Sequence, residues 1–139
     1  MNAPLYTLDI LRLAASLPEP VKLERVDASA SARSPTCGST IATEVQLKDG
    51  RVEALSQTVT ACAFGQASAA LVAQQAAGHG SEDIRTALGQ LTAWLSGERS
   101  DPPDWPGYEA LGPALTRKSR HGAILLPLRA LSAALESTG

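Results

Sequence analysis

A chain of 139 residues has the length of one ordinary folded domain, and 44% hydrophobic with 19% charged residues describes a globular protein. Its 12 basic and 14 acidic residues give a net charge of −2, which argues against a general nucleic-acid binder, because such proteins carry a clear basic excess. The N-terminal stretch lacks the basic start of a signal peptide, and no run approaches the roughly 18 apolar residues of a membrane span. We therefore expect one cytoplasmic domain, residues 1–139, that binds neither nucleic acid nor membrane.

The chain is expected to begin with a short helix. Thr7 is placed to cap this helix, and Pro18 and Pro20 end it. The stripe predicted to face the core is Leu8, Leu11 and Ala15, supported by Ile10, Ala14 and Leu17. After the helix, the loose alternation over residues 21–36 predicts a weak strand.

A β-hairpin is the clearest local pattern. Residues 41–47 alternate between an apolar and a polar face, and residues 51–59 return as the partner strand. Between them, "KDG" supplies the turn, because Asp49-Gly50 is a typical hairpin dipeptide. The alternation of the second strand slips near Leu55, which indicates a bulge.

Helices are expected to follow the hairpin. The Ala-rich stretch after Cys62 predicts one helix with Gly78 as its stop, and Ser81 is placed to cap another that ends near Gly97. A Pro/Gly-rich connector then leads to a last helix in "AILLPLRALSAALES", which Pro127 must begin or kink. The order along the chain is therefore helix, antiparallel strands and helices.

The two cysteines flank the hairpin. Cys37 lies in the turn-forming stretch "SPTCGST" before it, and Cys62 lies directly after it. Cytoplasmic thiols stay reduced, so a disulfide is not expected, and two inert buried thiols or a shared site remain as alternatives. Because a hairpin brings its two ends together, Cys37 and Cys62 are predicted to be neighbours, which favours the shared site.

Cys62 and His121 each precede a predicted helix. Unpaired N–H groups at a helix N-terminus stabilise a thiolate, so Cys62 is expected to be a good nucleophile and metal ligand. In "TRKSRHGAI", His121 stands beside Arg117, Lys118 and Arg120. Cations are unfavourable at a helix N-terminus. This segment is therefore either a solvated loop or the neighbour of an anion, such as thiolates, a persulfide or an acidic partner surface.

Other residues have ordinary structural interpretations. His79 is expected to be an exposed turn residue, and Trp94 and Trp105 are expected to pack at the edge of the domain. Asp101 and Asp104 lie in the connector and are minor candidates for a metal ligand. The glycines do not form a phosphate-binding pattern.

Three stretches in order, "PTCGSTI", "TACAFGQASAAL" and "SRHGAILLPLRAL", make the chain resemble the iron–sulfur cluster assembly scaffolds of the IscU, SufU and NifU N-terminal type. The resemblance runs from about Leu5 to Leu135. It implies an α+β fold: a small antiparallel β-sheet of about three strands, with an N-terminal helix and several C-terminal helices packed on it. It also implies a scaffold that accepts sulfur from a cysteine desulfurase and passes its cargo to apo iron–sulfur acceptor proteins.

The ligands implied by the resemblance are Cys37, Cys62 and His121, and the implied cargo is iron or a transient [2Fe–2S] cluster, with zinc bound at the same ligands in many members. Two departures reduce this set. The family's Cys-Gly-Asp is Cys-Gly-Ser here, with Ser39 in place of the carboxylate, and the family's third cysteine falls on Gly122. A Leu-Pro-Pro-Val-Lys chaperone motif is missing from the sequence, so an Hsp70-type partner is not expected.

Three hypotheses follow. The first is a non-enzymatic scaffold or sulfur acceptor of iron–sulfur cluster assembly. The second is a degenerate scaffold, zinc-binding or metal-free, that regulates the desulfurase or the assembly complex by contact. The third, which has the least support, is a hydrolytic enzyme with Cys62 as nucleophile and His121 as base, because no oxyanion-stabilising or orienting group is evident in the sequence.

Overall fold

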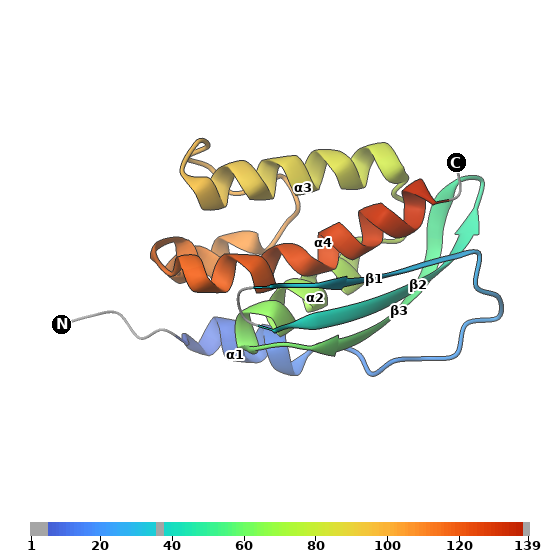
Figure 1. Cartoon of the computed structure of the whole chain (residues 1–139), viewed down its shortest axis with the longest axis horizontal. Helices are drawn as coiled ribbons and strands as arrows, with labels where there is room; N and C mark the ends of the chain where they lie inside the picture. The colour runs from blue at the N-terminus through green and yellow to red at the C-terminus, as the bar shows by residue number, and fades with distance from the viewer. Residues whose placement is uncertain (1–5, 36–37, 138–139) are drawn as a thin grey trace.

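The computed structural model describes residues 6–35 and 38–137 of the chain (Figure 1). The fold is α+β, as expected. Its elements are α1 (Leu8–Ala15), β1 (Ala28–Arg33), β2 (Thr40–Lys48), β3 (Arg51–Thr60), α2 (Ala63–Gln75), α3 (Ser81–Ser96), the 3-10 helices η1 (Tyr108–Thr116) and η2 (Lys118–Arg120), and α4 (His121–Glu136). Within the described ranges, the helices are too short or too polar to cross a membrane.

The strands form one antiparallel sheet in the order β1-β2-β3. Its hairpin turn places Asp49 at φ 54° and Gly50 at φ 76°, the pair of left-handed residues that a tight two-residue turn requires. At the other end of the hairpin, Thr40 pairs with Thr60. The predicted hairpin is confirmed, and the weak strand expected within residues 21–36 is β1.

A register shift interrupts the pairing of β2 with β3. Gln46 pairs with Ala54 while the next residue pairs with Val52, so Glu53 is the extra residue on β3. The bulge predicted near Leu55 is therefore present two positions earlier. It lies at the turn end of the hairpin, away from the end where the predicted site residues begin.

Helices cover one face of the sheet. Ile41, Thr43 and Val45 of β2 are buried on this face, as their alternation predicts. α4 lies along β1 and β2, α2 lies against β3, and α1 packs on α2 (Figure 1). The core therefore lies between the sheet and these helices.

The first helix forms as predicted but buries a different side. The Thr7 hydroxyl accepts a hydrogen bond from the Ile10 N–H at 3.2 Å, which caps α1. The predicted stripe is wrong, because Leu8 is 60% and Leu11 is 47% exposed while Ile10 is fully buried. Apolar residues occupy more than one side of this helix, and packing on α2 selects the side that carries Ile10.

The cap of α3 also differs from the expectation. Gly80, not Ser81, is the capping residue, and the Asp83 carboxylate accepts a hydrogen bond from the Gly80 N–H at 3.3 Å. The helix ends at Gly97 with φ 87°, the left-handed conformation that its glycine stop requires. One residue separates the two possible caps, and the carboxylate three residues after Gly80 decides between them.

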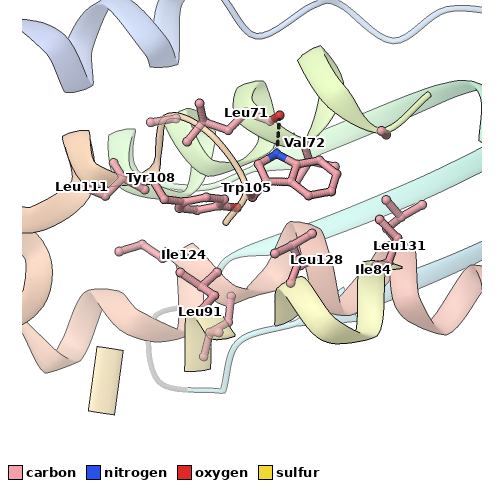
Figure 2. Packing of buried hydrophobic residues seen from close by; sticks show 14 of the residues in the cluster. Leu71, Val72, Ile84, Leu91, Trp105, Tyr108, Leu111, Ile124, Leu128 and Leu131 are labelled. Atoms are coloured by element: carbon pink, nitrogen blue, oxygen red, sulfur yellow. Dashed lines mark hydrogen bonds between the residues drawn. The ribbon is translucent and has the colours of Figure 1, made fainter. Parts of the chain in front are cut away.

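The Pro/Gly-rich connector is more ordered than expected. Its Trp105 belongs to the core, and the residues between the connector and α4 form η1 and η2. Trp94 and Trp105 are each only 5% exposed, so their predicted place at the edge of the domain is wrong. The Trp105 indole N–H donates to the Leu71 carbonyl of α2 at 2.9 Å (Figure 2). This bond satisfies the one polar atom of a buried indole.

The last helix begins at His121, two residues before the predicted start, and Pro127 lies inside it. The predicted face is buried: Leu128, Leu131 and Leu135 all lie in the core. Leu125 and Leu126 are buried as well, because α4 lies between the sheet and α3. α4 is therefore the central helix of the fold.

Candidate functional site

One end of the sheet gathers the segments that carry the predicted site. Thr40 and Thr60 pair where β2 begins and β3 ends. Next to them, Ile41 packs against Leu126 of α4, with Val59 of β3 in the same small cluster. The start of β2, the end of β3 and the N-terminal half of α4 therefore meet at this end, which we call the site end (Figure 1).

The first turns of α2 and α4 touch each other at the site end. A Cβ atom on Gly65 of α2 would lie 3.3 Å from the Cβ atom of Ala123 in α4. Glycine therefore permits an approach that a larger residue prevents. Cys62 and His121 begin these two helices, so they lie on either side of the same helix contact.

Cys62 is the N-cap of α2 and a free thiol. It is partly buried, packs against the core and makes no side-chain capping bond. Its carbonyl accepts the first hydrogen bond of the helix, from the Gln66 N–H at 2.9 Å. Cys62 therefore stands at the start of α2, as predicted, while its thiol makes no hydrogen bond to the N–H groups of the first turn.

Cys37 lies outside the described residues, so its proximity to Cys62 stays a prediction. The residues around it form a tight connection from β1 to β2. The Ser34 N–H donates to the Ser39 carbonyl at 2.9 Å, and the Gly38 N–H donates to the Ser34 carbonyl at 3.0 Å. Ser39, at the position where the family that the sequence resembles has a carboxylate, is only 5% exposed. A neutral, buried hydroxyl is a weak substitute for that ligand.

His121 is held by one of its ring nitrogens. Its Nε2 atom lies 2.8 Å from the carbonyl oxygen of Ala114 in η1. A carbonyl oxygen only accepts hydrogen bonds, so Nε2 must carry a proton, and in the neutral ring Nδ1 then carries the free electron pair. Nδ1 is thus the nitrogen that can bind a metal ion. The sequence gives no sign of this contact, because the partner is a backbone atom.

The basic residues before His121 are accessible. Arg117 and Lys118 are exposed and Arg120 is partly buried. Within residues 6–35 and 38–137, no carboxylate forms an ion pair with any of these three cations. The site end therefore carries a positive segment whose charge is not neutralised by the described part of the protein.

The other candidates are placed elsewhere. His79 is a turn residue with 40% side-chain exposure, and its Nδ1 lies 3.2 Å from the Asp83 carboxylate. Asp104 pairs with Arg99 at 3.4 Å. In the part of the chain that the structure describes, no three His, Cys, Asp or Glu side chains are grouped to hold a metal ion.

Three donors remain as candidates: the thiols of Cys37 and Cys62 and Nδ1 of His121. This set suits a zinc or iron ion with one coordination position left open. It falls short of the four protein ligands of a [2Fe–2S] cluster, because Gly122 has no side chain to contribute. By the number of its donors, the predicted set therefore suits a single metal ion better than a fully ligated cluster.

No protein-family model matches this chain, and no curated protein matches it in sequence. Solved structures do match it. A nitrogen-fixing NifU-like protein (N-terminal) from Brucella abortus is 27% identical, with a TM-score of 0.89 over 96% of this chain and 94% of the other. An iron–sulfur cluster assembly scaffold assigned to the SUF system of Fervidobacterium islandicum is 18% identical, with a TM-score of 0.78 over 94% and 96%. The structural resemblance predicted from the sequence is thereby confirmed.

Proposed function

We propose that this chain, which matches NifU-like N-terminal and SufU scaffold proteins in structure, accepts sulfur from a cysteine desulfurase and holds iron or a nascent [2Fe–2S] cluster for transfer to apo-proteins. The observation that carries the proposal is the match in fold over 96% of the chain at a TM-score of 0.89. Cys62 and His121 at the starts of two touching helices support it.

The sulfur-accepting step is a thiol–persulfide exchange. The thiolate of Cys37 attacks the outer sulfur of a persulfide on the donor enzyme, a new S–S bond forms, and the donor's S–S bond breaks. The donor cysteine leaves as a thiolate, so the exchange needs no external oxidant or reductant. Cys37 is proposed for this step because its place in the sequence falls between β1 and β2, and loops between strands commonly carry functional residues.

Cargo retention is proposed to depend on Cys62, His121 and Cys37 together. Three donors leave one position open to water, a donor group or an acceptor thiolate. An incomplete ligand set holds its cargo weakly, which favours release to an apo-protein. We also propose that residues 1–139 act as one domain, because the larger core cluster draws on α1 through α4. This domain is proposed to be cytoplasmic.

A regulatory role is the second candidate. Ser39 is buried where the family has a carboxylate, and Gly122 stands where the family has a cysteine. A scaffold with this reduced set is a candidate for a zinc-binding or metal-free protein that contacts the desulfurase without carrying a cluster. We propose a non-enzymatic role, because the chain matches a NifU-like protein and a SUF-system scaffold protein in fold.

The test is anaerobic incubation with a cysteine desulfurase and cysteine, followed by mass spectrometry and then by reconstitution with iron. A protein heavier by one sulfur atom, and a visible-absorbing cluster that transfers to an apo-ferredoxin, support the scaffold. Tight desulfurase binding without sulfur or iron uptake supports the regulator instead. If the protein neither binds the desulfurase nor takes up sulfur or iron, the scaffold and the regulator are both contradicted.

A further inference from the structure

We infer that the 3-10 helix η1 fixes which nitrogen His121 presents at the site end, with Tyr108 and Ser68 as positioning residues. The use of this nitrogen as a metal ligand rests on the proposed function. The geometry of the hydrogen bonds does not depend on that function.

The first part of η1 is tied to α2 and α4 by a buried chain of hydrogen bonds. Ser68 Oγ of α2 lies 2.7 Å from the Tyr108 hydroxyl and 2.7 Å from the carbonyl oxygen of Ile124 in α4. The Ile124 oxygen can only accept, so it takes the single hydroxyl proton of Ser68. The Tyr108 hydroxyl must then donate to Ser68 Oγ.

Burial protects these hydrogen bonds from competition with water. Tyr108 and Ser68 have no exposed surface, and Tyr108 lies among the buried side chains of α2 and α4 (Figure 2). Burial raises the pKa of the Tyr108 hydroxyl, so it keeps its proton at any physiological pH. A buried hydroxyl that loses its partner costs free energy, which favours the one arrangement in which every group is bonded.

The last part of η1 holds the imidazole. Ala114 lies six residues after Tyr108 in the same 3-10 helix, and its carbonyl accepts the Nε2 proton of His121. Leu111, between them, is fully buried. The helix is therefore fixed at Tyr108, packed at Leu111 and bonded to His121 near its end.

This arrangement has a chemical consequence for the ring. A neutral imidazole without a fixed partner exchanges its proton between two nitrogens and offers either of them to a metal. A carbonyl that holds the Nε2 proton selects Nδ1 and orients the ring, and such outer contacts commonly change metal affinity by about 10-fold or more. η1 supplies this carbonyl, and the bonds of Tyr108 and Ser68 set its position.

The experiment compares Tyr108→Phe and Ser68→Ala with Trp105→Phe. The control removes a different buried hydrogen bond to α2, from Trp105 to Leu71, and does not alter either partner of the bond from Ser68 to Ile124 of α4. The tautomer of His121 is read in the metal-free protein by long-range proton–nitrogen NMR at neutral pH. Zinc affinity is measured by competition with a chelating dye.

We expect a single Nε2–H tautomer in the unaltered protein and in Trp105→Phe. Tyr108→Phe and Ser68→Ala should show a mixture of tautomers and zinc affinity lower by about 10-fold. A mixed or Nδ1–H tautomer in the unaltered protein overturns the inference. So does an effect in Tyr108→Phe and Ser68→Ala no larger than in Trp105→Phe. A fixed tautomer in a protein that accepts no sulfur contradicts the proposed function and leaves the inference standing.

Discussion

Gly65 controls how closely α2 and α4 approach at the site end. In Gly65→Ala the new Cβ atom would lie 2.7 Å from the Cβ atom of Ala61 and 3.3 Å from that of Ala123. Ala61 directly precedes Cys62, so the strain falls on the residues that position the thiol. We expect a loss of about 1–3 kcal/mol in the free energy of unfolding, measured by denaturant titration, together with weaker zinc binding.

The chain contains a matched control for this substitution. Gly89 lies inside α3 and has no atom within 4 Å of an added Cβ atom. Gly89→Ala is therefore expected to stabilise the protein by up to about 1 kcal/mol, because alanine is the better helix former. Equal destabilisation by both substitutions would contradict the role assigned to Gly65.

The two thiols are expected to have different tasks. Cys37→Ser should abolish sulfur acceptance from a desulfurase, because the accepting thiol must be reached by the donor persulfide. Cys62→Ser should leave acceptance partly intact and prevent retention of metal or cluster, because Cys62 is fixed at the start of α2. Mass spectrometry of each variant after incubation with desulfurase and cysteine checks this. Sulfur found only on Cys62 would reverse the assignment.

At the scale of single elements, α3 depends on the Asp83 carboxylate. The Gly80 N–H and then the hydrogen bond from His79 hold the pKa of Asp83 below its ordinary value of 3.8. Because the pKa is lowered in the folded state, the ionised carboxylate stabilises the fold at pH values above the ordinary pKa of 3.8. This stabilisation is lost as the pH falls through the pKa of the folded state. Asp83 is exposed, so its contribution is small.

Asp83→Asn should therefore lower the free energy of unfolding by about 0.5 kcal/mol at pH 7, and the difference should disappear in acid. Thermal unfolding at a series of pH values measures it. Glu82→Gln is the control, because it removes the same charge from the same turn, and within the described ranges Glu82 has no hydrogen bond or ion pair. A difference that persists in acid would show that Asp83 acts by packing.

The 3-10 helix η2 carries the exposed Lys118 and the partly buried Arg120 beside His121, and an acidic partner surface is the neighbour that suits them. Lys118→Glu should slow association with the desulfurase several-fold at low salt, with the difference shrinking as salt is raised. Lys48→Glu makes the same change of charge at the opposite end of β2. Stopped-flow or surface-based kinetics compares them, and equal slowing by both would assign the effect to net charge.

For the whole molecule, zinc binding should appear as added thermal stability. A ligand that binds only the folded state stabilises it by about 2.7 kcal/mol at a free concentration of about 100 times Kd, which raises the Tm of a domain of this size by about 8 °C. The chain has only two histidines, which gives a direct control. His121→Ala should remove most of the zinc-induced shift, and His79→Ala should keep it. A shift retained in His121→Ala would exclude His121 as a ligand.

Patterns in the sequence predict much of this fold, because they reflect interactions between residues that are close together in the chain. The Asp49-Gly50 turn, the alternation in β2 and the Thr7 cap depend on residues close together in the chain, and all are confirmed. Burial of Trp105 and exposure of Leu8 depend on which distant surfaces meet. Periodicity alone does not contain that information.

The candidate site likewise has some features that the sequence predicts and others that only the structure shows. Cys62 and His121 are recognisable by residue type and by their position before helices. The partner of the imidazole is the carbonyl of Ala114, which any residue at that position would supply. The bond between Ser68 and Tyr108 joins polar residues far apart in the chain. Both contacts need the three-dimensional structure to be seen.

The central position of α4 has a consequence for how the protein is made. α4 is the last element of the described chain, yet it packs against the sheet, α2 and α3. During synthesis from the N-terminus, the sheet and the first three helices emerge before the helix that completes their core. Cys62 is thus exported from the ribosome well before His121, and a nascent chain that ends before α4 has both cysteines without His121. Under the proposed function, the three-residue ligand set is complete only after α4 has been made, so we expect iron loading to follow the synthesis of α4.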